Sequence, residues 1–136
     1  MTRAMARSAA DWNALNDALA GELVLPGAPG YEVARRPAIA NFQDARPRAV
    51  ALCAHPADVV QALAFARRFG VEVAPRSGGH CFAGRSSTDG IVIDVTPMRA
   101  VSVSDGTATV GAGARLEAVY DALGQHGVTL PAGCTG

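Results

Sequence analysis

Two short apolar runs separated by one amphipathic segment restrict what this chain can fold into. The runs are residues 49–53 and 71–74, and the segment between them begins at His55-Pro56 and closes at Gly70. Proline suits the first turn of a helix, and glycine commonly ends one. Strand, helix and strand in this order make a βαβ unit, whose strands are parallel and end at the same edge of the sheet. Open α/β sheets bind their ligands at that edge.

The first residues predict a helix followed by a linker. A capping box starts at Ser8, and apolar side chains follow at helical spacing over about residues 9–20. Residues 26–30 are rich in proline and glycine and break this pattern. We therefore divide the chain into a helical arm with its linker, residues 1–29, and a domain, residues 30–136.

Three more elements are predicted after the βαβ unit. A third strand covers residues 91–95, residues 100–103 and 107–110 are the arms of a hairpin, and a helix runs over about residues 115–126. The residues that we expect to pack in the interior are Trp12, Cys53, Val59, Leu63, Ala66, Leu116, Val119, Tyr120 and Leu123.

The composition is that of a globular chain, with 49% hydrophobic and 18% charged residues among 136. The formal net charge is zero and no basic run is interleaved with aromatic residues, so nucleic acid is not an expected partner. Three widely spaced cysteines, Cys53, Cys81 and Cys134, favour a reducing compartment over a disulfide framework. No apolar stretch has the length of a secretory signal or a transmembrane helix, so we expect a cytoplasmic protein with no membrane partner.

The loop after the second predicted strand, residues 75–86, holds the residues of chemical interest. Gly78 and Gly79 allow positive φ angles and let successive amide groups point into one concavity, as a phosphate or diphosphate requires. Further donors in the loop are Arg76, Ser77 and Ser86. From these residues alone, an ordinary turn and a cofactor site both remain open.

His80 directly follows the two glycines. A single histidine is most often a structural or surface residue. Beside a phosphate-binding loop, however, an imidazole can face the reactive part of a cofactor, and neutral imidazole is a good nucleophile near pH 7. Both interpretations of His80 therefore stay open at this level.

Three motifs together resemble those of a known family. They are Arg76-Ser77-Gly78-Gly79-His80, Phe82-Ala83-Gly84-Arg85-Ser86 and Asp89-Gly90-Ile91-Val92-Ile93-Asp94-Val95, with further matches at Tyr31, Arg35 and residues 56–59, 110–114 and 130–133. In this strand–helix–strand context the sequence resembles the FAD-linked oxidases of the vanillyl-alcohol oxidase and p-cresol methylhydroxylase (PCMH) superfamily, most of all the berberine-bridge-enzyme-like branch. The resemblance runs from about Trp12 to Gly136.

The resemblance implies an α+β fold. The chain would form the α/β-type first subdomain of a PCMH-type FAD-binding domain, truncated before the substrate domain. FAD is the implied cofactor, with its diphosphate on the loop, and His80 matches the histidine that bonds covalently to the 8α-methyl carbon of the flavin. The implied cofactor-binding residues are Arg76, Ser77, Gly78, Gly79, His80, Cys81, Gly84 and Ser86.

The family also implies an activity, the oxidation of a small-molecule alcohol, sugar or secondary metabolite with molecular oxygen as acceptor. Its substrate-binding and proton-abstracting residues lie in later parts of the family fold, so we assign no catalytic residue and expect this chain alone to be inactive. Some relatives bind flavin a second time through the cysteine of a Gly-x-Cys-Pro motif. Thr135 stands at that position and Cys134 comes one residue early, so we expect no second bond.

Two other interpretations fit parts of the sequence. Cys53 and His55 follow the first strand, and His80 and Cys81 follow the second, so neighbouring strands would gather four zinc-type ligands at one edge. Their spacing is not a recognised zinc signature, and we assign no metal. The other alternative is a non-catalytic remnant without useful affinity for FAD, because half of the FAD envelope of the family is missing.

Overall fold

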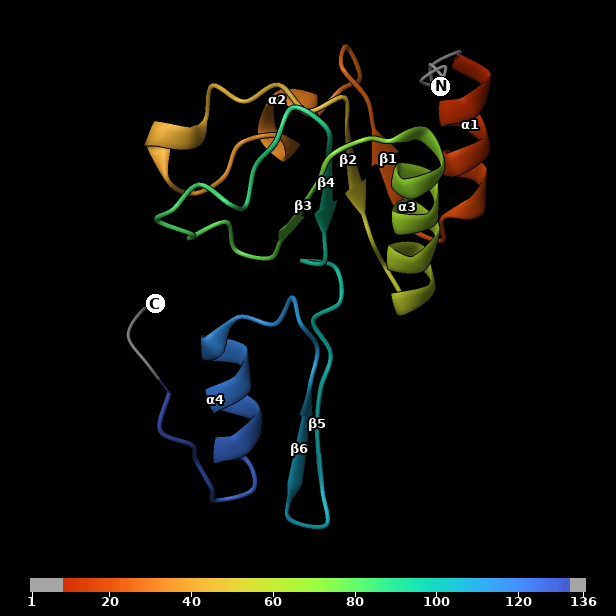
Figure 1. The fold of residues 1–136 in the computed structure, drawn as a ribbon. Coiled ribbons are helices and arrows are strands. Elements are labelled where there is room, and N and C mark those ends of the chain that lie inside the picture. The colour runs from red at the N-terminus through yellow and green to blue at the C-terminus, as the bar shows by residue number, and fades with distance from the viewer. Residues whose placement is uncertain (1–8, 133–136) are drawn as a thin grey trace.

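A computed structural model describes residues 9–132, and its central feature is a four-stranded sheet in the order β1-β2-β4-β3 (Figure 1). β4 pairs in parallel with β2 on one side and with β3 on the other, while β1 adds an antiparallel edge. The strands are β1 Glu22–Val24, β2 Ala49–Leu52, β3 Val73–Arg76, β4 Ile91–Asp94, β5 Val101–Ser104 and β6 Thr107–Val110. The helices are α1 Ala9–Ala18, α2 Tyr31–Ala34, the 3-10 helix η1 Ala40–Phe42, α3 Pro56–Phe69 and α4 Leu116–Gly124.

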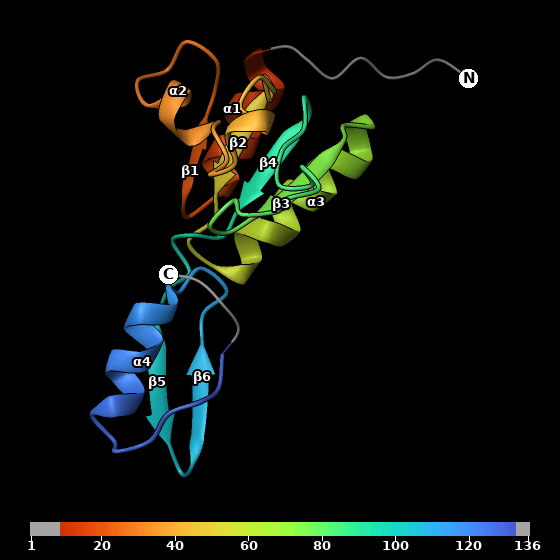
Figure 2. The same ribbon diagram turned by 90° about the vertical axis from the view of Figure 1, so that its left-hand side faces the viewer.

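Side chains of the sheet alternate between two cores, as the two-residue period of a strand requires. Ala51 and Ile93 belong to a core with α1 and α3, which lie together on one face of the sheet (Figures 1 and 2). Val50 and Val92 belong to the opposite core, which Tyr31 of α2 covers. Both faces of β2 and β4 are therefore largely buried, and this explains their nearly continuous apolar sequences.

Asp58 joins the end of the N-terminal arm to the start of α3. Its carboxylate accepts hydrogen bonds from four backbone amides, those of Ala20 (2.8 Å), Gly21 (3.1 Å), Ala54 (2.8 Å) and His55 (3.3 Å). Burial acts to raise the pKa of Asp58, but these four bonds outweigh it and hold the pKa below its usual value. One buried carboxylate thus fixes the arm on the βαβ unit.

A second, smaller lobe holds the β5–β6 hairpin with α4 beside it, and it lies beyond the end of the four-stranded sheet (Figures 1 and 2). The hairpin turns at Asp105 and Gly106, whose φ angles of 49° and 73° suit a type I′ turn. Two linkers connect the lobes, and they touch each other. A Cβ on Gly113 would lie 2.2 Å from the carbonyl oxygen of Val95, so these linkers can approach only because residue 113 is glycine.

The structure confirms the α+β fold and each predicted helix and strand, with changes at the boundaries. Trp12 packs on Phe65 with ring centroids 4.8 Å apart, which confirms its docking role, and Cys53 is fully buried. The prediction of buried side chains is wrong at Leu63 and Tyr120, which are 40% and 37% exposed. In α3 the buried face is rotated toward Ala62 and Phe65, because α1 covers the helix from that side.

Three further points concern the N-terminal part of the chain. β1 was not predicted; it lies among the residues that we assigned to the arm and linker, and it pairs with β2. The capping residue Ser8 lies outside the described residues. None of the helices within residues 9–132 is long and apolar enough to cross a membrane.

Candidate functional site

The loop of residues 77–90 connects the end of β3 to the start of β4, and its first half lies at the carboxyl end of β3, toward the second lobe (Figure 1). The carboxyl ends of β2, β3 and β4 all meet at this edge, because the three strands are parallel. This is the edge where open α/β sheets bind ligands. The structure therefore places the predicted loop where the sequence pattern required it.

Arg76, the last residue of β3, closes the loop from inside the protein. Its side chain is buried, and its Nε donates to the carbonyl of Ser86 at 2.9 Å. Its Nη1 and Nη2 donate to the carbonyls of Ala34 (2.6 Å) and Arg35 (2.9 Å) at the end of α2. The guanidinium thus holds both ends of the loop and α2 together, and its direct contact with a phosphate stays a prediction.

Gly79 and Gly84 fix the loop against the segment that follows α2. Gly79 has a φ of 74° and its carbonyl accepts a bond from the amide of Ala38 at 3.2 Å; a Cβ there would lie 3.0 Å from that same nitrogen. Gly84 has a φ of 72°, and a Cβ on it would lie 2.6 Å from the ring of Phe42. Both positions therefore need glycine for their backbone angle and for close packing.

The amide groups near the start of the loop are not used by the protein itself. Within residues 9–132, the backbone N–H groups of Gly78, Gly79 and His80 have no acceptor. The loop that carries them is nevertheless held by Arg76 and by Ala38. Adjacent amides in a held glycine loop are the donors that a diphosphate needs.

The imidazole of His80 is exposed and lies over Gly78. A Cβ on Gly78 would come within 2.9 Å of Cδ2 of His80, so any side chain at residue 78 would displace the ring. The imidazole of His80 is therefore accessible from solvent, and it lies beside the backbone amides that have no acceptor. The structure thus places the predicted nucleophile and the predicted phosphate donors on the same stretch of loop.

Ser77 and Thr96 connect the loop to the linkers between the lobes. The hydroxyl of Ser77 donates to the carbonyl of Ala112 at 2.9 Å, and the hydroxyl of Thr96 donates to the carbonyl of Ser77 at 3.2 Å. Ser77 was predicted as a donor to phosphate, but a hydroxyl has one hydrogen and here it is engaged by Ala112. No sequence pattern indicates this link, because both acceptors are backbone carbonyls.

Cys81 and Ser86 occupy different environments on the loop. Cys81 is partly exposed, and hydrogen bonds from the amides of Arg85 and Ala83 lower the pKa of its thiol. Ser86 is buried, and its backbone carbonyl accepts the hydrogen bond from Nε of Arg76. Cys134, the other candidate for a flavin bond, lies outside the described residues.

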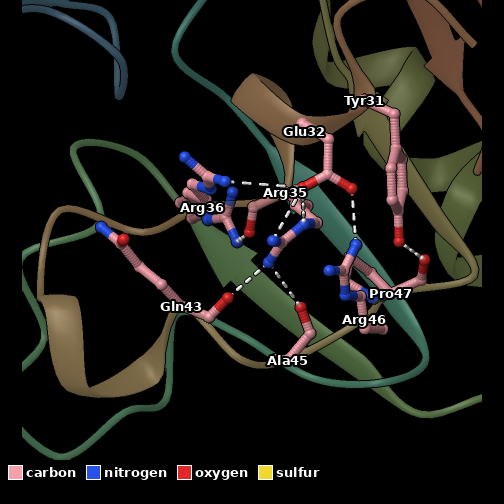
Figure 3. A network of polar contacts seen from close by, with 9 residues as sticks. Tyr31, Glu32, Arg35, Arg36, Gln43, Ala45, Arg46 and Pro47 are labelled. Atoms are coloured by element: carbon pink, nitrogen blue, oxygen red, sulfur yellow. Dashed lines mark hydrogen bonds and ion pairs between the residues drawn. The ribbon is translucent and has the colours of Figure 1, made fainter.

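Behind the loop, a network of ion pairs and hydrogen bonds holds α2 and the segment up to β2 (Figure 3). Glu32 binds the buried Arg35 at 2.8 Å and the exposed Arg46 at 2.5 Å, and these pairs lower the pKa of Glu32. Arg35 also donates to the carbonyl of Gln43. The hydroxyl of buried Tyr31 donates to the carbonyl of Pro47 at 2.6 Å, so Tyr31 is a packing residue that also ties α2 to this segment. The sequence did not predict this network, although two of its residues, Tyr31 and Arg35, are among the positions that match the family.

The arrangement that a zinc site would need is not present. The zinc alternative required the first two predicted strands to be neighbours, and β4 lies between them. Cys53 is in the core, where burial raises the pKa of its thiol to about 11. No group of three or more histidine, cysteine or acidic residues that could hold a metal occurs within residues 9–132.

The α+β fold and the glycine loop fit a protein that holds a nucleotide cofactor, and comparison with known proteins specifies FAD as that cofactor. Residues 47–135 match the family described as FAD binding domain. The chain belongs to this FAD-binding family. Berberine bridge enzyme-like 18 of Arabidopsis thaliana is 34% identical over 85 residues, which cover 57% of this chain and 16% of that protein, and this similarity agrees with the resemblance seen in the motifs.

Similar proteins include FAD-linked oxidoreductases from bacteria. The uncharacterized FAD-linked oxidoreductase YgaK of Bacillus subtilis is 34% identical over 118 residues, which cover 85% of this chain and 26% of that protein. The (R)-6-hydroxynicotine oxidase of Paenarthrobacter nicotinovorans is 34% identical over 101 residues, or 71% of this chain and 20% of that enzyme.

A similar solved structure is that of the berberine-bridge-enzyme-like protein 1 of Physcomitrella patens. It has a TM-score of 0.80 and 31% identity, and the match covers 90% of this chain and 28% of that protein. This chain thus spans about a quarter or less of the length of the curated relatives described here.

Proposed function

We propose that this chain is the N-terminal FAD-binding part of an FAD-dependent oxidoreductase and that it holds the diphosphate of FAD on the loop from Ser77 to Ser86. The observation that carries the proposal is the set of free amides at Gly78, Gly79 and His80, on a loop held at both ends and placed at the ligand-binding edge of the sheet. Glycine at residue 79 allows the positive φ of 74° that the loop needs there. The described residues therefore fit the diphosphate of FAD.

We also propose that His80 binds the flavin covalently. In support of this, its imidazole is exposed beside the amides that would hold the diphosphate, and it matches the covalent histidine of the family. A neutral imidazole nitrogen would supply the electron pair for the new bond to the 8α carbon, which would lose a proton; the two electrons released would reduce the flavin, and molecular oxygen would reoxidise it. The bound flavin would supply the redox chemistry, accepting two electrons and a proton equivalent from a substrate.

The activity proposed for the whole protein is the oxidation of a small alcohol, sugar or secondary metabolite, with molecular oxygen as acceptor. Relatives include the (R)-6-hydroxynicotine oxidase and the aclacinomycin oxidase of Streptomyces galilaeus, which is 44% identical over 85 residues, covering 58% of this chain and 16% of that enzyme. The described residues supply a cofactor loop but no group that we assign to substrate.

Titration of the chain with FAD, followed by denaturation, tests both parts of the proposal. Binding should quench the fluorescence of free FAD, and after prolonged incubation part of the flavin should remain with the protein in denaturant. H80A should still quench the fluorescence but release all flavin in denaturant. A chain that never quenches FAD fluorescence would contradict FAD binding and would favour a remnant without cofactor. A chain that binds FAD and releases all of it in denaturant would contradict only the covalent bond.

A further inference from the structure

The side chain of Arg76 makes contacts that a direct phosphate ligand would not need. It is only 5% exposed, although it lies at the base of the proposed cofactor loop. All three of its nitrogen atoms donate to backbone carbonyls, at distances between 2.6 and 2.9 Å. Burial lowers the pKa of the guanidinium, and the neighbouring carboxylate of Asp94 opposes this change.

The three carbonyls belong to two segments that are far apart in the sequence. One is Ser86, at the far end of the loop, and the others are Ala34 and Arg35, at the end of α2. The carbonyls at the end of a helix lack partners within it and carry partial negative charge, so they suit a cation. A planar guanidinium with donors in a fixed fork can bind both segments at once, whereas a lysine ammonium offers its donors from a single point.

We infer that Arg76 is a positioning residue for FAD rather than a residue that contacts its phosphates. It closes the loop between Ser77 and Ser86 against α2, and the amides of Gly78, Gly79 and His80 thereby keep one arrangement before the cofactor arrives. The expected effect of Arg76 on FAD binding rests on the proposed function. The closing of the loop does not, because it is a property of the chain without cofactor. The fork of guanidinium donors, which lysine lacks although it carries the same charge, is the feature that matters.

Two substitutions separate shape from charge. Arg76→Lys keeps the positive charge and most of the length, and Arg76→Gln removes the charge. If the fork holds the loop, both variants lose the simultaneous bonds to Ser86 and to α2. If Arg76 serves as a charge for the diphosphate, Arg76→Lys keeps most of the FAD affinity. Arg67→Gln, at an exposed arginine of α3, is the matched control.

Hydrogen exchange in the chain without FAD measures the closing of the loop. We expect the hydrogen-bonded amides at the loop, those of Ala38, Gly84 and Ser87, to exchange about ten- to a hundredfold faster in both Arg76 variants, as the loss of a buried hydrogen bond to a charged group predicts. Amides of β2, β4 and α3 should exchange at the rate of the wild type. Unchanged exchange in the loop would overturn the inference. Equal acceleration over the whole chain, or global unfolding of both variants by circular dichroism, would also overturn it, because Arg76 would then be a general stability residue.

The affinity of the variants for FAD supplies a second readout. Positioning predicts that Arg76→Lys and Arg76→Gln lose FAD affinity by similar factors, while Arg67→Gln binds as the wild type does. Retention of affinity in Arg76→Lys alone would show a direct role of the charge and would contradict the inference. If the wild-type chain binds no FAD, the proposed function fails, and the hydrogen-exchange result still decides whether Arg76 closes the loop.

Discussion

The carbonyl of Gly79 accepts a hydrogen bond from the amide of Ala38 at 3.2 Å, and the two backbones are so close that a side chain at residue 79 would touch that amide. The contact fixes the start of the proposed FAD loop to the segment after α2. It also exposes the loop to a simple test, because a single methyl group should disturb it.

We expect Gly79→Ala to abolish FAD binding and to lower stability. The positive φ of residue 79 costs alanine about 1–2 kcal/mol, and the close contact with Ala38 adds about 1–3 kcal/mol. Gly106→Ala is the matched control, because Gly106 has a nearly identical φ of 73° in open space, away from the loop. Denaturant unfolding and FAD titration measure the two effects. Equal FAD affinity in both variants would argue against a role for the Gly79 contact.

Asp58→Asn should destabilise the chain and change its response to acid. The loss of a charged acceptor for four amides should cost about 1.5–3 kcal/mol at neutral pH. Because the folded pKa of Asp58 is depressed, its contribution is complete above the unfolded pKa, about 3.9, and is lost as the pH falls through the lower folded pKa. Stability of the wild type should therefore fall more steeply below about pH 4 than that of the variant. The exposed Asp17 supplies the control Asp17→Asn, which should behave as the wild type.

Ser77→Ala should loosen the link between the FAD loop and the second lobe. The bond from its hydroxyl to Ala112 is partly solvent-exposed, so the loss in stability should be about 1 kcal/mol or less. Hydrogen exchange should accelerate in residues 111–115, with no change in α1 or α3. Ser102→Ala, on an exposed face of β5, is the control. An effect of Ser77→Ala on FAD affinity that exceeds its effect on exchange would show that this hydroxyl turns to the phosphate instead.

Much of this fold follows from local patterns in the sequence. The parallel strands, α3 and the hairpin are specified by apolar runs, by Pro56 at a helix start and by glycines that permit positive φ angles. β1 was missed because three residues after a turn carry too little pattern, and only pairing with β2 defines them. The sheet order was equally hidden, because the strand that enters between β2 and β3 comes later in the chain.

The site was predictable in place but not in detail. Glycines followed by a histidine marked the loop and its position after β3, since these residue types have few other uses together. The contacts that hold the loop involve backbone carbonyls of Ser86, Ala34 and Ala112, and any residue type supplies a carbonyl. Long-range bonds of this kind leave no signal in a single sequence.

Chemical-shift changes of the backbone amides during an FAD titration test the central claim most directly. We predict that the amide signals of Gly78, Gly79 and His80 in a ¹⁵N-labelled chain shift strongly with FAD, and that riboflavin, which lacks the diphosphate, leaves them in place. Amides of α1 and of the hairpin tip should not move with either compound. Shifts of equal size with riboflavin, or FAD binding without any change at these three amides, would contradict the claim that they hold the diphosphate.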